Sequence, residues 1–367
     1  MTSAYAIYRL PYAHEATLIQ QTEGEPAEFL SCTELNGRSG FVVAPFQVTP
    51  QQPILLIRPD SVERVACGLG HSEERVRFAT AKDSTLSSQA VANPPLNTYA
   101  IDFANYHSQL RQGTFRKIVL ARCADEQTAE AIDPMTLFYR ACELYPRMFI
   151  SLVNTAKSGC WLMATPEILL EQHDNLWRTI ALAGTMKLEG EQLAGEGETL
   201  TWSTKNIQEQ RIVATYITEC LEQFTSDFHE EGPRTVRAAN LVHLRSDFTF
   251  SLPDDSRLGN LLQVLHPTPA VCGLPKRDTF DFIVNNEHTP RRYYSGFMGP
   301  LGLRSSISND QPSTHLYVSL RCMNIEGNRY HLYAGGGLLK DSIEEQEWQE
   351  TEAKLETMRQ CIAIKKM

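Results

Sequence analysis

Residues 148–183 read MFISLVNTAKSGCWLMATPEILLEQHDNLWRTIALA, and this stretch decides the fold class. It contains four apolar runs of strand length, separated by short polar or turn-forming segments. Strands linked by tight turns are typical of antiparallel meanders rather than of a doubly wound parallel sheet. The four predicted strands are Met148–Val153, Cys160–Ala164, Ile168–Glu171 and Trp177–Ala183.

Other strands and a few long helices surround this stretch, which predicts an α+β fold. Helices are predicted after a cap at Asn97 or Thr98, from Asp133-Pro134 to about Tyr145, over Lys205–Phe224 and over Glu344–Met358. The first helix has its apolar face at Tyr99, Phe103, Tyr106 and Leu110. Further strands are predicted at Gly40–Ala44, Pro53–Ile57, Lys117–Ala121, Tyr294–Gly299, Leu316–Cys322 and Tyr330–Gly335, with Ser305–Thr314 as a hairpin loop.

The charge balance limits the partners of the protein. The 367 residues include 34 lysines and arginines against 44 aspartates and glutamates, so the formal net charge is −10. We therefore expect neither a nucleic acid, whose binding needs basic patches, nor an anionic membrane surface as a partner. An anionic small molecule remains open, because the local field of a site can oppose the net charge.

The termini and cysteines predict a cytoplasmic protein. The N-terminal MTSAYAIYRLPYAHE lacks the basic and apolar segments of a signal peptide, and no run of 18 apolar residues predicts a membrane span. Nine scattered cysteines without a CxxC pair argue against a disulfide framework and against a structural zinc site. A reducing compartment fits this pattern best.

Two residues are candidates for acid and base chemistry. Lys117 opens the apolar strand KIVLA, where a lysine either extends to water or, if desolvated, loses its proton and acts as a base. Glu167 follows Ala164-Thr165-Pro166 between two apolar runs. It is either a solvated turn residue or a buried carboxyl whose pKa is raised enough to donate a proton at neutral pH. Nothing in their spacing requires the pair to act together.

The last predicted helix offers candidate metal ligands. Glu347, Glu350 and Lys354 lie near one face of it, at positions i, i+3 and i+7. The face is either a solvated row of ion pairs or a magnesium site, since Mg²⁺ takes one or two carboxylates together with water and substrate oxygens. Glu209 on the other long helix could supply a further carboxylate.

Three further features could bind an anion. Ala334-Gly335-Gly336-Gly337 follows a predicted strand, and its backbone either approaches a ligand closely or forms a plain turn. Arg321, placed inside the strand Leu316–Cys322, is either paired or directed inward to bind a carboxylate. His266 begins the stiff segment His-Pro-Thr-Pro-Ala and could equally be a structural hydrogen-bonding residue.

Together these segments resemble the chorismate-utilising enzyme family, which includes isochorismate, salicylate, anthranilate and aminodeoxychorismate synthases. The resemblance covers about residues 98–360, in matching order and approximate spacing. The matching segments are KIVLAR at 117–122, ATPEILL at 164–170, ALAGT at 181–185, KNIQEQRIV at 205–213, LHPTPAVCGLP at 265–275, RRYYSGFMGPLG at 291–302, YVSLRC at 317–322, AGGGLLKDS at 334–342 and EWQETEAKL at 347–355.

The resemblance implies two stacked, mostly antiparallel β-sheets flanked by helices, with the active site in a cleft beside the sheets. Residues 98–367 would form the chorismate-binding catalytic region. Residues 1–97 match only loosely and would be the N-terminal part of the same fold, ending in a surface linker at Ala81–Asn97 that is rich in Ser, Ala, Asn and Pro.

The resemblance also implies roles for the candidate residues. Lys117 would activate the water that attacks C2 of chorismate, and Glu167 would protonate the departing C4 hydroxyl. Glu209 and Glu350 would bind Mg²⁺ directly and Glu347 through water, so that the metal holds the ring carboxylate. The remaining substrate contacts would come from Arg321, Tyr294, Lys354, Gly335 and Gly337 at the enolpyruvyl carboxylate, and from His266 and Gly184 near the ring.

Two positions narrow the implied activity. Family members that add water at C2 carry a lysine where Lys117 stands, whereas ammonia-using anthranilate synthases usually carry glutamine. Aminodeoxychorismate synthases carry a nucleophilic lysine in a PIKGT-like segment, where this chain has Ala183. The resemblance thus implies an isochorismate synthase feeding menaquinone or siderophore biosynthesis, with a salicylate synthase or a non-catalytic chorismate-binding homologue as alternatives. No amidotransferase subunit is expected.

The chain departs from the family pattern in one helix. The usual signature Lys-Asp/Glu-x-x-Glu-His reads Lys205-Asn206-Ile207-Gln208-Glu209-Gln210 here. Asn206 removes a carboxylate near the metal, and Gln210 replaces a histidine. We expect these changes to affect the affinity for the metal and the orientation of Glu209.

Overall fold

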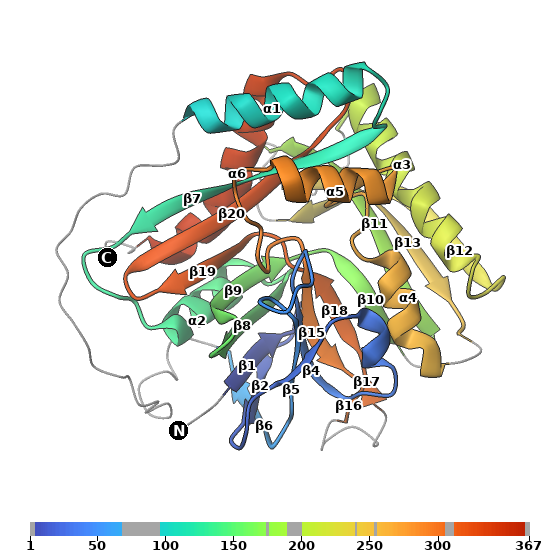
Figure 1. Ribbon diagram of the computed structural model, residues 1–367. Coiled ribbons are helices and arrows are strands. Elements are labelled where there is room, and N and C mark those ends of the chain that lie inside the picture. Colours follow the sequence, from blue (N-terminus) through green and yellow to red (C-terminus); the bar gives the residue numbers. More distant parts are fainter. Residues whose placement is uncertain are drawn as a thin grey trace.

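Two large sheets form the centre of the computed structural model, and within the described residues each has nine strands, all antiparallel to their neighbours (Figure 1). The structure describes residues 4–67, 96–173, 176–188, 200–238, 241–252, 255–304 and 312–363. The predicted α+β class with antiparallel sheets is confirmed.

The strand order of each sheet mixes early and late parts of the chain. The first sheet runs β14 (Gly273–Leu274), β7 (Lys117–Gln127), β20 (Arg329–Leu338), β19 (Cys322–Glu326), β9 (Gly159–Thr165), β8 (Phe149–Thr155), β1 (Ala4–Arg9), β2 (Glu15–Gln21) and β6 (Ser61–Ala66). The second runs β12 (Phe228–Ala238), β13 (Leu241–Phe250), β11 (Leu176–Lys187), β10 (Ile168–His173), β18 (His315–Val318), β15 (Phe297–Leu301), β4 (Gly40–Ala44), β5 (Ile54–Ile57) and β3 (Ala27–Phe29). A small hairpin joins β16 (Leu303–Arg304) to β17 (Pro312–Ser313).

The two sheets stack face to face, and alternating side chains fill both sides of each sheet. In β4, Phe41 and Val43 join the core between the sheets, whereas Val42 and Ala44 belong to the core on the outer face. Phe149 of the first sheet stacks on Tyr317 of the second with ring centroids 4.3 Å apart. Burying large aromatic surfaces between the layers stabilises their stacking.

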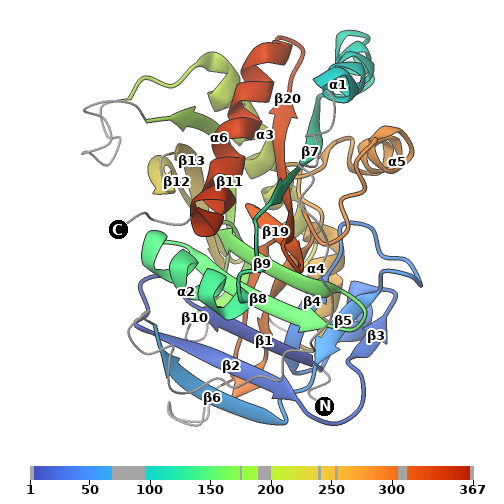
Figure 2. The ribbon, with the colours of Figure 1, turned by 90° about the vertical axis from the view of Figure 1, so that its left-hand side faces the viewer.

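Helices cover the outer faces of both sheets (Figure 2). α2 (Pro134–Leu144) and α6 (Glu344–Ile362) pack on the first sheet, whereas α3 (Thr204–Leu221) and α4 (Leu258–Leu265) pack on the second. α1 (Leu96–Arg111) and α5 (Lys276–Asn286) pack beside β7 and β20. The Asp133 carboxylate accepts a hydrogen bond from the Thr136 amide, which confirms the predicted cap of α2.

Two of the passages of the chain from one sheet to the other lie side by side. One is between β9 and β10, where Glu167 lies, and the other is between β18 and β19, where Arg321 lies. The Val318 amide donates to the Glu167 carbonyl at 2.9 Å, and the Ala164 amide donates to the Arg321 carbonyl at 3.1 Å. The two crossovers therefore hold each other in place.

The second crossover corrects a predicted strand. Leu316–Cys322 is not one strand, because β18 ends at Val318 and Arg321 has φ +46°, in the left-handed region. A strand cannot leave one sheet and enter the next without bending, so Arg321 lies in the bend rather than inside a strand. Tyr294 likewise lies in the turn before β15, not in the predicted strand Tyr294–Gly299.

The glycine triplet is also placed differently from its prediction. Gly335, Gly336 and Gly337 do not follow a strand but lie within β20, where they pair with residues 119–121 of β7. The strand continues through three glycines because β7 pairs with all three and because side chains from the helices pack directly on the glycine backbone.

Helix ends differ slightly from their predictions. α1 begins at Leu96, ahead of the predicted cap at Asn97 or Thr98, but its apolar face is buried as expected. α3 ends at Leu221, before Phe224, and α6 continues past Met358 to Ile362. The predicted linker Ala81–Asn97 lies outside the described residues up to residue 95, and so does most of the predicted hairpin loop Ser305–Thr314.

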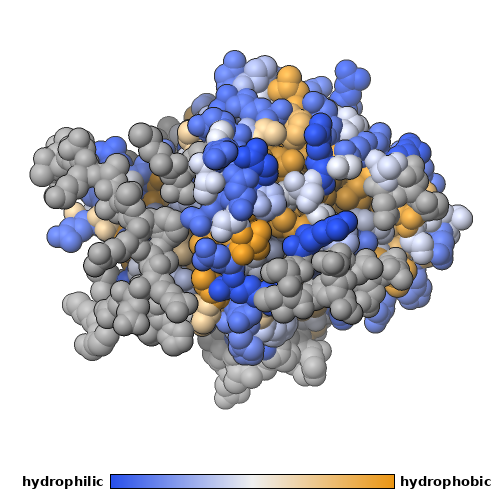
Figure 3. All heavy atoms as spheres, turned by 90° about the horizontal axis from the view of Figure 1, so that it is seen from below, coloured by the Kyte–Doolittle hydropathy of each residue, from blue (hydrophilic) through white to orange (hydrophobic). Residues whose placement is uncertain are grey.

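Exposed large hydrophobic side chains are spread over many elements. On the face seen in Figure 3, hydrophobic residues occur in separate groups among hydrophilic ones. Among the described residues, no helix is both long and apolar enough to cross a membrane. In the part of the chain that the structure describes, the exposed large hydrophobic residues are Tyr12, Leu30, Val62, Ile101, Leu176, Ile207 and Ile343.

Candidate active site

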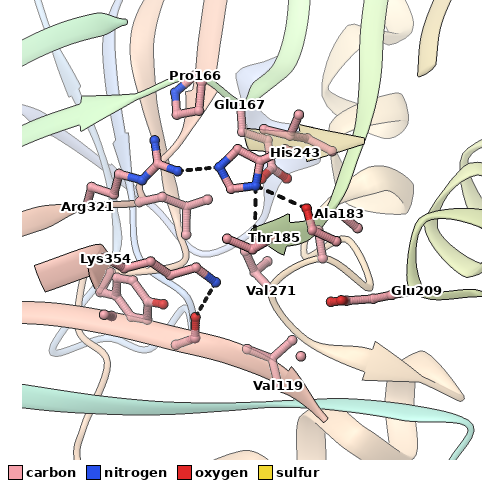
Figure 4. Close-up of a pocket in the computed structure, with 18 residues that line it drawn as sticks. Val119, Pro166, Glu167, Ala183, Thr185, Glu209, His243, Val271, Arg321 and Lys354 are labelled. Carbon is pink, nitrogen blue, oxygen red and sulfur yellow. Dashed lines mark hydrogen bonds between the residues drawn. The ribbon is translucent and has the colours of Figure 1, made fainter. Parts of the chain in front are cut away.

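A pocket lies where the two sheets separate (Figure 4). Both crossovers, the glycine part of β20, the bulged part of β11 and the helices α3 and α6 contribute to its wall. Figure 4 shows Glu167, Lys354 and Glu209 approaching it from different sides. The acidic and basic groups in the wall come from five separate parts of the chain. They belong to Glu167, Glu209, His243, Arg321 and Lys354.

Glu167 is a buried carboxyl in the pocket wall. Glu167 is 3% exposed, so it is not the solvated turn residue of the alternative interpretation. Burial raises its pKa to about 8, although Lys117, Arg321 and Lys354 act in the opposite direction. At neutral pH the carboxyl therefore keeps its proton and can serve as a general acid.

Lys117 is fully buried, so it does not extend to water. Its Nζ lies 2.9 Å from Oε1 of Glu209 on α3. Burial alone would raise the pKa of Glu209, but Lys117 and Lys205 outweigh it and hold that pKa below its usual value. Glu209 lines the pocket and Lys117 lies next to it, behind the backbone of Gly337.

Gly337 is required by this close packing. A Cβ at this position would overlap Oε1 of Glu209 and lie 2.9 Å from Cε of Lys117. Gly335 is similarly constrained, since a Cβ there would lie 2.7 Å from Oη of Tyr294, which is buried in the pocket wall. The triplet therefore lets a helix and two buried side chains meet the β20 backbone.

The three predicted metal ligands converge on this part of β20. A Cβ at Gly336 would lie 3.4 Å from Oε2 of Glu347 and 3.8 Å from Oε1 of Glu350. Both glutamates line a neighbouring cavity that shares Thr185 with the main pocket. The structure thus brings Glu209, Glu347 and Glu350 to one region, although their oxygens do not all lie within 4.8 Å of one another.

Each of these glutamates is paired with a lysine. Glu209 pairs with Lys117, Glu347 with Lys205, and Glu350 with Lys354 at 2.7 Å. Burial and the neighbouring Glu350 raise the pKa of Glu347.

The donor set fits Mg²⁺. Its members are all carboxylate oxygens, which Mg²⁺ prefers. Oε2 of Glu347 is buried without a hydrogen-bond partner among the described residues, so it is available to a cation or to the water that a cation holds.

Arg321 is oriented by a histidine that the sequence did not single out. Nδ1 of His243, on β13, lies 3.2 Å from the Gly184 carbonyl, and Nε2 meets a guanidinium nitrogen of Arg321. Burial and the charge of Arg321 hold the pKa of His243 well below its usual value. The neutral ring therefore donates from Nδ1 and accepts at Nε2, which fixes the guanidinium in the pocket.

Lys354 and Gly184 complete the anion-binding side. Nζ of Lys354 donates to the Gly335 carbonyl at 2.9 Å. Gly184 lines the pocket at φ +75°, and a Cβ there would lie 3.0 Å from the Asn206 carbonyl. Glycine is required because the bulge needs a left-handed residue and α3 packs against it.

His266, like Lys117, Glu347 and Glu350, is a predicted site residue that does not line the main pocket. Its ring packs against Phe297 with centroids 5.0 Å apart, and it is not among the residues that line the pocket. Burial and Lys276 lower the pKa of His266 to about 3, so the ring is neutral. The proposed contact of His266 with the substrate ring therefore stays a prediction.

A buried ion pair supports two walls of the pocket. Arg291 and Glu287 are each 2% exposed, and Nε of Arg291 lies 2.6 Å from Oε2 of Glu287. Arg291 also donates to the carbonyls of Val119 at 2.8 Å and Val271 at 2.6 Å, and both valines line the pocket. The sequence gives no signal for this buried pair, since an i, i+4 pair of opposite charges is usually a surface feature.

Comparison with known proteins gives the family. The family model described as chorismate binding enzyme matches residues 54–363, which is most of the chain. This chain belongs to the chorismate-binding enzyme family.

Individual relatives agree with the family match. The isochorismate synthase EntC of Escherichia coli (strain K12) is 27% identical over 313 residues, which cover 84% of this chain and 78% of that protein. The salicylate biosynthesis isochorismate synthase of Pseudomonas aeruginosa is 32% identical over 264 residues, 70% of this chain and 52% of that protein. The crystal structure of DhbC from Bacillus anthracis matches this chain with a TM-score of 0.79 at 23% identity. The match covers 99% of this chain and 97% of that chain, which shows a shared fold.

The departures from the family signature can now be placed in this chorismate-binding enzyme. Gln210 is fully buried and donates to Oγ of Ser246 at 2.8 Å, so it ties α3 to β13. Asn206 lines the cavity of Glu347 and Glu350. The orientation of Glu209 is instead set by Lys117.

Proposed function

We propose that this chorismate-binding enzyme is an isochorismate synthase, which converts chorismate reversibly to isochorismate. The single observation that carries the proposal is the buried Glu167, which remains protonated at neutral pH at the edge of a pocket rich in cations. Chorismate is a dianion that must lose a hydroxyl, so it needs both the cations and the acid. The names of the relatives support the same activity.

In this proposal, Lys117 and Glu167 divide the proton transfers. In its neutral form, which requires that another cation in place of Lys117 balance Glu209, Lys117 accepts a proton from the water whose oxygen bonds to C2, the ring double bonds shift, and the C4–O bond breaks. Glu167 gives its proton to the leaving hydroxyl, which departs as water. Each general acid or base typically contributes about 10²–10⁴-fold to the rate.

The proposed substrate contacts follow from the charges. Arg321, held by His243, and Lys354 would bind the enolpyruvyl carboxylate beside the backbone of Gly335. Glu209 and Glu350 would hold Mg²⁺ directly and Glu347 through water. When bound, the Mg²⁺ would neutralise the repulsion between these glutamates and the ring carboxylate of the substrate.

Two other functions remain as alternatives. A salicylate synthase would use the same acid and base but would go on to eliminate pyruvate. A non-catalytic homologue would bind chorismate without turnover, which the presence of Lys117, Glu167, Glu209 and Glu350 in one region disfavours. Ala183 lines the pocket where a nucleophilic lysine would be needed to form aminodeoxychorismate.

Product analysis distinguishes these functions. Purified protein with chorismate and Mg²⁺ should yield isochorismate by chromatography, approached from either side of the equilibrium. A coupled lactate dehydrogenase assay should detect no pyruvate. Stoichiometric pyruvate would instead support a salicylate synthase, and binding of chorismate in calorimetry without any product would support the non-catalytic homologue.

We also propose a cytoplasmic location and a role in menaquinone or siderophore biosynthesis. All nine cysteines are free, as expected in a reducing compartment. To test the biosynthetic pathway, this protein is supplied again to a strain that lacks it. Recovery of menaquinone or of a catechol siderophore in that strain identifies the pathway.

A further inference from the structure

A second group of metal-binding side chains lies at the other end of β7 and β20 from Lys117 and the glycines. It consists of Cys123, Asp125 and His331, and within the part of the chain that the structure describes it is the one group of three whose ligand atoms all lie within 4.8 Å of one another. Neither the family match nor the proposed reaction uses it.

The sheet itself holds these side chains together. Cys123 and Asp125 lie two residues apart on β7, so they share a face, and Asp125 pairs directly with His331 on β20. Oδ1 of Asp125 lies 3.8 Å from Sγ of Cys123 and 2.6 Å from Nδ1 of His331. Only small movements would bring the three atoms around one ion.

The donor set differs in kind from that of the three glutamates. One thiolate sulfur, one imidazole nitrogen and one carboxylate oxygen are ligands of Zn²⁺ and related ions with tetrahedral sites, whereas Mg²⁺ prefers oxygen alone. Oε2 of Glu326 lies 3.6 Å from Nε2 of His331 and adds negative charge nearby.

The site is accessible from water. The side chains of His331 and Asp125 are 26% and 30% exposed, and Cys123 is half-buried. A metal ion can therefore enter without unfolding the sheet, and water can fill the fourth position of a tetrahedral site.

We propose that Cys123, Asp125 and His331 bind a zinc-class divalent ion that joins β7 to β20. This site is independent of the proposed reaction, because it lies at the opposite end of the two strands from Lys117. Sequence analysis expected no structural zinc site because no CxxC pair occurs, but here the ligands meet across two strands that are far apart in the sequence.

The proposal is tested by titrating the protein with Co²⁺, a spectroscopic substitute for Zn²⁺, in the presence of saturating Mg²⁺. We expect a thiolate-to-cobalt charge-transfer band that saturates at one equivalent and disappears when Zn²⁺ is added. The absence of a thiolate band at one equivalent would overturn the proposal.

Three variants assign the band to this site. Cys123→Ser should abolish it, whereas Cys160→Ser, which alters another half-buried strand cysteine of the same sheet, should leave it unchanged. His331→Gln, at a position whose side chain is 26% exposed, should weaken Co²⁺ binding by at least about tenfold. Unchanged binding in His331→Gln, or an unchanged band in folded Cys123→Ser, would contradict the assignment.

Discussion

The pKa of Glu167 connects the burial of a single residue to the activity of the whole enzyme. The carboxyl is protonated below its pKa of about 8 and ionised above it. We therefore expect kcat for the formation of isochorismate to fall as the pH rises through about 8. Glu167→Gln should lower kcat by about 10²–10⁴-fold, because the amide cannot donate the proton. The measurement is a steady-state pH profile of both proteins, and a wild-type rate in the variant would exclude the assigned role.

The same residue predicts a pH dependence of stability. In the unfolded chain Glu167 ionises near 4.5, whereas in the folded protein it keeps its proton up to about 8. The folded state therefore binds more protons in this interval, so its stability falls as the pH rises. Urea unfolding should show the free energy of the wild type falling relative to Glu167→Gln between pH 4.5 and 8. If the free energies of unfolding of the wild type and of Glu167→Gln change with pH in parallel, the pKa of Glu167 is not raised in the folded protein.

Lys117 is tested against a lysine outside the pocket. Lys117→Ala should lower kcat by about 10²–10⁴-fold, because it removes the proposed base. Lys157→Ala, at an exposed residue that pairs with Glu28 at 3.4 Å, should leave kcat unchanged. Calorimetry should show that Lys117→Ala still binds chorismate, which separates a lost base from an unfolded protein. Equal rates in the two variants would remove Lys117 from the reaction.

At the scale of elements, the pair of Arg291 and Glu287 couples α5 to two pocket walls. Arg291→Met leaves the Glu287 carboxylate buried without its partner, which typically costs about 3–5 kcal/mol. Urea unfolding should show this loss, and the double variant with Glu287→Met should recover part of it. Arg277 and Asp281 form a matched control, because they are an exposed i, i+4 pair on α5. If Arg277→Met lowers the free energy of unfolding as much as Arg291→Met does, the buried pair of Arg291 and Glu287 has no special role in stability.

The sequence predicted most elements because their signals are local. The four strands of residues 148–183 appear as β8 to β11, and the Asp133 cap begins α2 as expected. The bends at Arg321 and Tyr294 were missed because apolar runs continue through the places where the chain changes sheets or turns. Local patterns carry no information on which sheet a strand joins.

The candidate site could be predicted only in part, because local sequence patterns do not show which distant residues meet. The family resemblance pointed to Lys117, Glu167 and Arg321, which the structure brings to one region. His243 was not found, since a single histidine in the strand LVHLRSDFTF gives no signal until Arg321 is seen beside it. The Arg291 and Glu287 pair depends on distant backbone carbonyls that no spacing reveals.

At the scale of the whole molecule, the net charge of −10 opposes an anionic substrate. The pocket must reverse this sign locally, and Arg321 and Lys354 do so only in part because Glu209 lies close by. We expect chorismate to bind much more weakly without Mg²⁺. Calorimetric titration with Mg²⁺ and with excess chelator would show this, and equal affinities would count against the proposed metal ligands.

The most direct measurement follows the oxygen atom that the proposed reaction adds. The protein is incubated with Mg²⁺ and chorismate in water enriched in ¹⁸O, and the isochorismate is analysed by mass spectrometry. Because solvent water attacks C2 while the C4 hydroxyl leaves, we expect the product of a single conversion to carry one ¹⁸O at C2. Isochorismate without the label, or no isochorismate at all, would contradict the roles proposed for Lys117 and Glu167.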